Sequence, residues 1–310
     1  MKQLFKWTGS KKRMKKIYGE QFFPKDFTTF VDVFAGALNT SHWCELSCSP
    51  SRYVINDFNS ELVNMYRALR DEPEAVIEDA LRHQTIHLNE PERETRKKYY
   101  VALKDRYCMR EGAPHGLTTA EEAAALLYML KVNFNGWWKT YNYANGRYST
   151  PPGLLTQKKD FMDESNLWAH AKFFKEKCDI QNVDFESVEG IDDTCFVYFD
   201  PPYRDSSTTY TTDGFNELDQ IRLCEFFKEC DAKGAKVALS NKEIGDGFFN
   251  DHLGDYNLNI FEAKYTAGRG TTVNKVQEIL VTNYDYEKPM PPPPKPKKDL
   301  IKTQTNSLEK

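Results

Sequence analysis

The stretch Cys195-Phe196-Val197-Tyr198-Phe199, followed by Asp200-Pro201-Pro202-Tyr203, decides how the rest of the sequence is interpreted. Its apolar and aromatic run predicts a strand that is buried on both faces, as in a parallel sheet covered by helices. Because ligands bind beyond the carboxyl ends of such strands, we expect the Asp200 carboxylate to lie in a binding site. The simplest alternative is a turn that merely ends a strand.

The two prolines give this turn a specific chemical character. They hold the backbone rigid and lack N–H groups, so their nitrogens donate no hydrogen bond. A carboxylate beside a carbonyl acceptor suits a planar amino group, which offers two donors. Such an amine is a poor nucleophile until acceptors hold its hydrogens. We therefore predict that Asp200 and the Pro201 carbonyl bind a planar amine and that Tyr203 stacks on its ring. Positioning and electrostatics would then supply most of the rate enhancement of the attack by this amine.

Two further buried strands are predicted upstream of this motif. Thr29 to Gly36 has the pattern of a strand that ends at a glycine turn, and Arg52 to Ile55 that of a strand that ends at Asn56-Asp57. Apolar residues at helical spacing predict a helix from Ser60 to Leu69. This order is typical of a nucleotide-binding α/β unit. Asp57 is then placed either to accept hydrogen bonds from ribose hydroxyls or to cap the following helix.

The middle of the chain has a different character. From about Asp71 to Asp160 the sequence predicts polar and charged helices without strong strand runs. One helix is expected over Ala123–Val132, with Thr119 and Glu122 as its capping box. The segment from Asn133 to Arg147 is crowded with aromatics and amides and ends in a hairpin-like turn signal. Such a segment favours contact with a partner over burial in a core.

Strand signals return after this insertion. We expect strands at Thr194–Phe199, Lys236–Leu239 and Val276–Val281, with a helix near Leu218–Lys233 between the first two. The predicted architecture is an α/β sheet (residues 1–70 plus 161–286) with an inserted, mainly helical domain (71–160). The remaining tail, 287–310, is rich in Pro and Lys at its start and is predicted to be extended or disordered.

The bulk composition is that of an ordinary globular protein. Hydrophobic residues make up 40% and charged residues 28% of the chain. No stretch approaches the roughly 18 consecutive apolar residues of a membrane helix, and no secretory signal is recognised. The seven cysteines have no framework spacing and are interpreted as reduced thiols. His42, Cys44 and Cys48 lie close together, but no second ligand pair with zinc spacing follows, so we predict no metal.

The charge of the chain is uneven. A formal net charge of −4 argues weakly against a partner made of phosphates. The N-terminal end is nevertheless strongly basic, because seven cationic residues precede the first acidic residue, Glu20: Lys2, Lys6, Lys11, Lys12, Arg13, Lys15 and Lys16. The simplest interpretation of such a cluster is a solvated charge run.

Taken together, these motifs resemble the Dam family of adenine-N6 DNA methyltransferases, in which the cofactor motif precedes the recognition region and the catalytic motif comes last. The resemblance spans about Leu4 to Tyr284 and includes closing segments at Ser240-Asn241 and Asn274–Leu280. It implies a Rossmann-like sheet that binds S-adenosylmethionine. The implied catalytic residues are Asp200, Pro201, Pro202 and Tyr203, and the implied cofactor-binding residues are Trp7, Lys11, Asp32, Phe34, Ala35, Gly36, Asp57, Asp184 and Phe185.

The implied activity is methyl transfer to N6 of an adenine within a specific sequence of double-stranded DNA. A base inside a duplex cannot reach a strand-end pocket, so the adenine must be flipped out, with Phe134 or Trp137 filling the gap. The implied DNA-contacting residues are Asn133, Phe134, Asn135, Trp137, Lys139 and Arg147. Trp137, Trp138 and Lys139 differ from the GATC-specific members, and Lys is a point charge where Arg offers a fork, so GATC is not implied.

Two alternatives stay open at this point. The same acceptor geometry suits a methyltransferase acting on RNA or on a protein amide, although the motif order and the segment from Trp7 to Lys11 favour DNA. A DNA-binding regulator without activity is the other alternative, against which the intact motif at Asp200 speaks. The implied setting is the cytoplasm of a bacterial or phage-infected cell, without membrane or metal, and with a possible cognate restriction endonuclease. Ala37-Leu38-Asn39 stands where the family usually has a second glycine and a small polar residue, so the geometry of the cofactor turn is expected to differ from the family's pattern.

Overall fold

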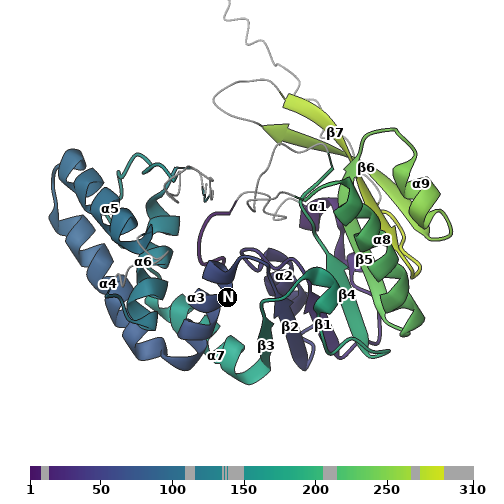
Figure 1. Cartoon of the computed structure of the whole chain (residues 1–310), viewed down its shortest axis with the longest axis horizontal. Coiled ribbons are helices and arrows are strands. Elements are labelled where there is room, and N and C mark those ends of the chain that lie inside the picture. Colours follow the sequence, from purple (N-terminus) through teal and green to yellow (C-terminus); the bar gives the residue numbers. More distant parts are fainter. Residues whose placement is uncertain are drawn as a thin grey trace, which may run out of the picture.

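A computed structural model describes residues 1–7, 14–108, 116–134, 136, 138, 150–204, 215–266 and 273–289. In these residues one seven-stranded sheet has the order β3-β2-β1-β4-β5-β7-β6 (Figure 1). The strands are β1 (Thr29–Asp32), β2 (Arg52–Asn56), β3 (Cys178–Gln181), β4 (Cys195–Phe199), β5 (Lys236–Glu243), β6 (Asn257–Thr266) and β7 (Val273–Thr282). The first five pair in parallel, and β7 is antiparallel to both β5 and β6.

Helices cover both faces of this sheet. The α-helices are α1 (Met14–Tyr18), α2 (Asn39–Ser47), α3 (Ser60–Asp71), α4 (Pro73–Asn89), α5 (Arg93–Cys108), α6 (Thr119–Val132), α7 (Glu164–Lys177), α8 (Glu217–Ala232) and α9 (Phe248–Leu253), and short 3-10 helices span Glu20–Phe22 and Phe185–Ser187. Alternate strand residues enter two cores: Phe30 and Phe196 face the core built with α2, α3 and α7, whereas Val31 and Val197 face the core built with α8 and α9. This double burial explains the continuous apolar runs.

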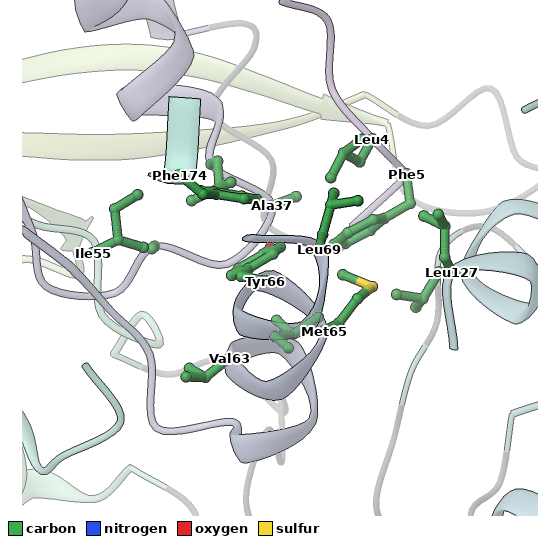
Figure 2. Close-up of a cluster of buried hydrophobic side chains, with 14 of the residues drawn as sticks. Leu4, Phe5, Ala37, Ile55, Val63, Met65, Tyr66, Leu69, Leu127 and Phe174 are labelled. Carbon is green, nitrogen blue, oxygen red and sulfur yellow. The ribbon is translucent and has the colours of Figure 1, made fainter. Parts of the chain in front are cut away.

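Helices α4, α5 and α6 form a lobe beside the sheet (Figure 1). Figure 2 shows how the lobe is joined to it: Met65 and Leu69 of α3 lie near Leu127 of α6, with Leu4 and Phe5 of the N-terminal segment next to them. All five side chains are buried. The division of the chain into a catalytic domain (1–70 plus 161–286) and an insertion (71–160) stays a prediction, because this core is continuous across it.

Three features of the fold differ from the sequence-based expectation. The capping box of α6 consists of Thr118 and Glu121, because Thr118 is the extended residue whose side chain accepts from the Glu121 N–H; the pairing of Thr119 with Glu122 was wrong. The strands β3 and β6 were not predicted, since both mix polar with apolar residues. Neither was α7 singled out. Across the described ranges, no helix combines the length and the apolar character that crossing a bilayer requires.

Two buried histidines join α2 to α7. The Nε2 atoms of His42 and His170 are 2.8 Å apart, and the Nδ1 atom of His170 lies 2.6 Å from the Asn166 carbonyl. Asn166 in turn accepts from the Lys2 backbone N–H at 2.8 Å, which attaches the N-terminal segment. Burial lowers the pKa of both histidines well below the ordinary value of 6.5, and for His42 the neighbouring His170 adds to the effect. The pair is therefore neutral in the folded protein at neutral pH.

This pair predicts a loss of stability in mild acid. The unfolded chain binds more protons than the folded chain below the ordinary histidine pKa, so the free energy of unfolding falls as the pH decreases, by up to about 1.4 kcal/mol per pH unit for each histidine. Urea unfolding of the parent and of His170→Gln between about pH 7.5 and about pH 5.5 should give a shallower decrease for the variant. Equal decreases would contradict the assignment.

Candidate active site

Three carboxylates meet at the carboxyl ends of neighbouring parallel strands. Asp32 ends β1, Asp57 follows β2 and Asp200 follows β4. Because β1 pairs with both other strands in parallel, these three positions share one edge of the sheet. The Asp200 and Asp57 charges both act on Asp32. The expected association of the catalytic motif with the upstream strands is therefore present in the fold.

Asp32 is the most deeply buried of the three. Its side chain is 2% exposed, and its Oδ2 atom accepts a hydrogen bond from the Ser41 hydroxyl at 2.6 Å. The pKa of Asp32 is raised to about 7, mainly because the carboxyl is buried; the Ser41 hydrogen bond opposes the shift, and the charges of Asp200 and Asp57 add to it. A cation bound here would favour the charged carboxylate, so the site suits a positively charged ligand.

The glycine turn after β1 is held against the end of β2. Gly36 has a φ of +46° and donates its N–H to Asp57 Oδ2 at 2.7 Å, while the Tyr66 hydroxyl donates to the Gly36 carbonyl. Asp57 Oδ1 accepts from the Asn59 N–H at 2.8 Å. The helix cap is Asn59, whose side chain accepts from the backbone of the first turn of α3. Asp57 therefore braces the turn and is not the cap of α3.

The departure at Ala37-Leu38-Asn39 has a definite geometry. Leu38 occupies the left-handed region with a φ of +61°, which is uncommon for a residue with a side chain. Its N–H donates to the Ala35 carbonyl at 2.7 Å, and its side chain is 1% exposed. The cost of this conformation is offset by apolar burial, so the turn needs no glycine at this position.

Trp7 lies on the same turn. A methyl group added to Gly36 would be 3.3 Å from the Trp7 indole, so the absence of a side chain at Gly36 lets the ring approach. The Phe5 ring packs edge-on against Trp7 with centroids 5.9 Å apart. Of the N-terminal motif, Trp7 is thus brought to the site; Lys11 lies outside the described residues.

Aromatic rings line the neighbouring part of the edge. Phe34 and Phe185 have centroids 5.8 Å apart, and Phe215 lies within 5.9 Å of both. The Asp184 carboxylate is bound by the Arg222 guanidinium at 2.7 Å. Phe58, which follows Asp57, is 62% exposed. Sequence reasoning missed Phe58; the signal was a large apolar residue directly after an acidic strand end.

Ser240 of β5 is at the centre of the contacts around the catalytic motif. Its hydroxyl lies 2.8 Å from the Tyr198 hydroxyl and 3.4 Å from Asp200 Oδ1. Tyr203 hydrogen-bonds Ser240 and Glu278 of β7, and burial followed by the Glu278 and Asp200 charges holds the pKa of its hydroxyl well above the ordinary value. The phenol stays neutral, and its anchored hydroxyl fixes the orientation of the ring.

The proline turn is braced from behind by side chains that the sequence did not single out. Gln220 of α8 donates to the Pro202 carbonyl at 2.9 Å, and Asn241 donates to Gln220 at 2.9 Å. Asn241 Oδ1 also accepts from the backbone N–H groups of Arg204 at 3.0 Å and Lys242 at 2.8 Å. The sequence signal for these residues was weak: polar side chains within otherwise apolar elements.

Two of the expected recognition residues are described: Asn133 is the C-cap of α6 (Thr119–Val132), and Phe134 follows it. Asn133 is 8% exposed, and its Oδ1 atom accepts from the Gly136 N–H at 3.1 Å, whereas Phe134 is 37% exposed. Asn135, Trp137, Lys139 and Arg147 lie outside the described residues. Among the side chains that the structure describes, no group of three His, Cys, Asp or Glu could hold a metal ion; His42 pairs with His170 instead of with Cys44 and Cys48.

The sequence is similar to those of known DNA methyltransferases. A family model described as D12 class N6 adenine-specific DNA methyltransferase matches residues 7–267. The chain is 35% identical over 291 residues to the type II methyltransferase M1.LlaDCHI of Lactococcus lactis subsp. cremoris, a match that covers 90% of this chain and 94% of that protein. It is 29% identical over 299 residues to the type II methyltransferase M.MjaIII of Methanocaldococcus jannaschii, a match that covers 92% of this chain and 99% of that protein. It is 27% identical over 253 residues to the DNA adenine methylase of Escherichia coli, with 77% of this chain and 80% of that protein covered.

The bracing network predicts a structural cost for Asn241→Leu. Leucine has a similar volume but leaves the Arg204 N–H and the Gln220 Oε1 atom without their partner, so we expect the free energy of unfolding to fall by about 3 kcal/mol. Asn250→Leu, at an exposed position of α9, is the control and should change it by less than about 0.5 kcal/mol. Urea denaturation measures both, and equal values would contradict the bracing role.

Proposed function

The chain belongs to the D12 class N6 adenine-specific DNA methyltransferase family, and from this premise we propose that Asp200, Pro201, Pro202 and Tyr203 carry out the transfer, with S-adenosylmethionine as the methyl donor. The observation that supports this assignment most is the position of Asp200 beside Asp32 at the carboxyl ends of paired parallel strands. Membership of this family favours an adenine-specific enzyme acting on DNA over the alternatives, which were a methyltransferase acting on RNA or on a protein amide and a DNA-binding regulator without activity.

The residues at the sheet edge fit the proposed cofactor. S-adenosylmethionine is a cation that supplies an electrophilic methyl group on its sulfonium centre. Asp32 and Asp57 provide carboxylates that a bound cation would keep ionised, and Gly36 accommodates the positive φ of the turn next to them. Phe34 and Phe185 offer apolar surface for the adenine end, to which we add the exposed Phe58. We further propose contacts from Trp7, Lys11, Ala35 and Asp184.

The catalytic motif acts by holding the target amine. Asp200 and the Pro201 carbonyl accept hydrogen bonds from the two N–H groups of the adenine amino group, which makes the nitrogen more tetrahedral and more nucleophilic. One of these hydrogens is lost as a proton when the nitrogen gains the methyl group. The Gln220 hydrogen bond to the Pro202 carbonyl keeps the turn in place. Tyr203, with its hydroxyl anchored by Ser240 and Glu278, presents a ring for stacking on the base. Positioning and electrostatic stabilisation supply the rate enhancement.

The DNA-binding role of the insertion is also a proposal. Phe134 is the exposed aromatic among its described residues that is suited to fill the gap left by a flipped adenine. Asn133, Asn135, Trp137, Lys139 and Arg147 complete the proposed contact set. The relatives named type II methyltransferases make a cognate restriction endonuclease a partner worth seeking. The location of the protein in the cytoplasm of a bacterial or phage-infected cell stays a prediction.

Sequencing that maps methylated adenines tests the proposed target specificity. DNA from cells that express the chain should carry N6-methyladenine at one short sequence, and DNA from cells that express Asp200→Ala should not. Methylation spread evenly over all adenines would contradict site specificity.

Asp200→Ala should remove catalysis and largely spare cofactor binding. The variant loses the acceptor that holds the amine, so we expect kcat to fall by at least about 1000-fold, whereas binding rests on the other strand ends. A filter assay with tritiated cofactor measures transfer, and calorimetry measures affinity. Asp255→Ala, at an exposed position outside the site, is the control. Retained turnover in Asp200→Ala would refute the assignment.

The raised pKa of Asp32 predicts that cofactor affinity depends on pH. A cation binds better to the ionised carboxylate, so the affinity should rise as the pH increases through about 7, by at most about tenfold per pH unit. Ser41→Ala removes the hydrogen bond that lowers the pKa of Asp32, so the pH at which the cofactor affinity rises should be higher in this variant. Asp32→Asn should bind weakly and without this pH dependence. A parent protein whose affinity is flat from about pH 6 to about pH 8 would contradict the role.

A further inference from the structure

We propose that Trp138 is a positioning residue that couples DNA recognition to cofactor binding through its hydrogen bond with Glu61. This inference rests on the proposed function, because it takes the insertion as the DNA-contacting part and the Gly36 turn as the cofactor-binding part. It concerns a side chain that the sequence places in the recognition segment but that the structure turns inward. The exposed fraction of Trp138 is 5%, so its role differs from that of a DNA-contacting aromatic.

The first contact runs from Trp138 to α3. The Trp138 indole N–H donates to Glu61 Oε2 at 2.7 Å, and Glu61 is 6% exposed. A hydrogen bond to a buried carboxylate is stronger than one between neutral groups. Glu61 lies in the first turn of α3, where its backbone N–H is bound by the cap Asn59. Asn59 in turn donates to Asp57, which holds the Gly36 N–H. A shift of Trp138 therefore reaches the cofactor turn through directly bonded groups.

A second contact leads from the same segment to the same turn. A side chain on Gly136 would lie 2.6 Å from the Lys6 carbonyl oxygen, so the two backbones are in close contact and only glycine fits there. The residue after Lys6 is Trp7, whose indole packs so closely on Gly36 that a methyl group there would be 3.3 Å from the ring. Gly136 and Trp138 are thus linked indirectly to the Gly36 turn by two routes, one through Lys6 and Trp7 and one through Glu61.

The start of the segment is also fixed. Gly136 donates to the Asn133 side chain at 3.1 Å, and the Phe134 N–H donates to the Pro151 carbonyl at 3.0 Å. Phe134 is exposed while Trp138, four residues later, is buried. The Phe134 ring is therefore exposed, whereas the Trp138 ring is buried and bonded to Glu61 of α3. A displacement of Phe134 by DNA acts on a segment whose other end is bonded to α3.

Such a connection has a thermodynamic consequence. If DNA binding favours the arrangement in which the Gly36 turn holds the cofactor, then DNA raises cofactor affinity and the cofactor raises DNA affinity by the same factor. A purely structural role of Trp138, in which it only packs the lobe against α3 and Tyr107, predicts no such factor. The two roles are separated by measuring the affinities of both ligands, alone and together.

The test uses the full-length chain, the non-reactive cofactor analogue sinefungin, and a duplex that contains the mapped target. Calorimetry gives the Kd of sinefungin without DNA and with saturating duplex. For the parent protein we expect the duplex to lower this Kd by about fivefold or more. In Trp138→Phe, which keeps a ring but loses the donor, the ratio should fall close to one while the Kd without DNA changes little. Trp168→Phe, at an exposed position of α7, should keep the parent ratio.

Glu61→Gln is the second variant and keeps an acceptor oxygen while removing the charge. It should also lower the ratio of the sinefungin Kd without DNA to the Kd with DNA. A thermal unfolding midpoint is measured for each variant to establish that it is folded, and Glu61→Gln serves as the test if Trp138→Phe fails to fold. An unchanged ratio in a folded variant of either residue overturns the inference. A parent that methylates DNA but has a ratio of one also overturns it and leaves the proposed function intact. A parent that binds no sinefungin and transfers no methyl group contradicts the proposed function itself.

Discussion

The parallel pairing of β1 with β4 at the centre of the sheet is the constraint on which the rest of the site depends. Both strands are buried on both faces, so their register is set by two cores at once. A slip by one residue would exchange the two faces and place every apolar side chain in the wrong core. The register that results aligns Asp32 with Tyr198 and lets the Asp200 charge act on Asp32. The geometry of the proposed active site is therefore a consequence of core packing.

This arrangement places three carboxyl groups close together, one of them fully buried, at the carboxyl ends of the strands. Asp32 is buried beside two other carboxylates, and its pKa rises for that reason. Among the described residues, the Ser41 hydroxyl is the main partner that lowers its pKa. A cationic ligand resolves this repulsion, which connects the electrostatics of the folded chain directly to the chemistry proposed for it.

Much of this was predictable from sequence because strong local signals coincide with central elements. The strands β1, β2, β4 and β5 and the helices α3 and α8 carry long apolar patterns, and the acidic ends follow from them. The edge strand β3 lacks such a pattern, since only Ile180 of its residues is buried. The brace of Gln220 and Asn241 and the pair of His42 and His170 join residues that are distant in sequence, which no local pattern reveals. The inward position of Trp138 depends likewise on α3.

The central claim is that the Asp200 motif delivers a methyl group to the exocyclic nitrogen of adenine in duplex DNA. Its most direct test is mass spectrometry of nucleosides from duplex DNA after incubation of the purified chain with S-adenosylmethionine carrying a deuterated methyl group. The expected result is that the label appears in N6-methyl-2′-deoxyadenosine and in no other nucleoside. Label on cytosine, or label only when RNA or protein is offered, would contradict it.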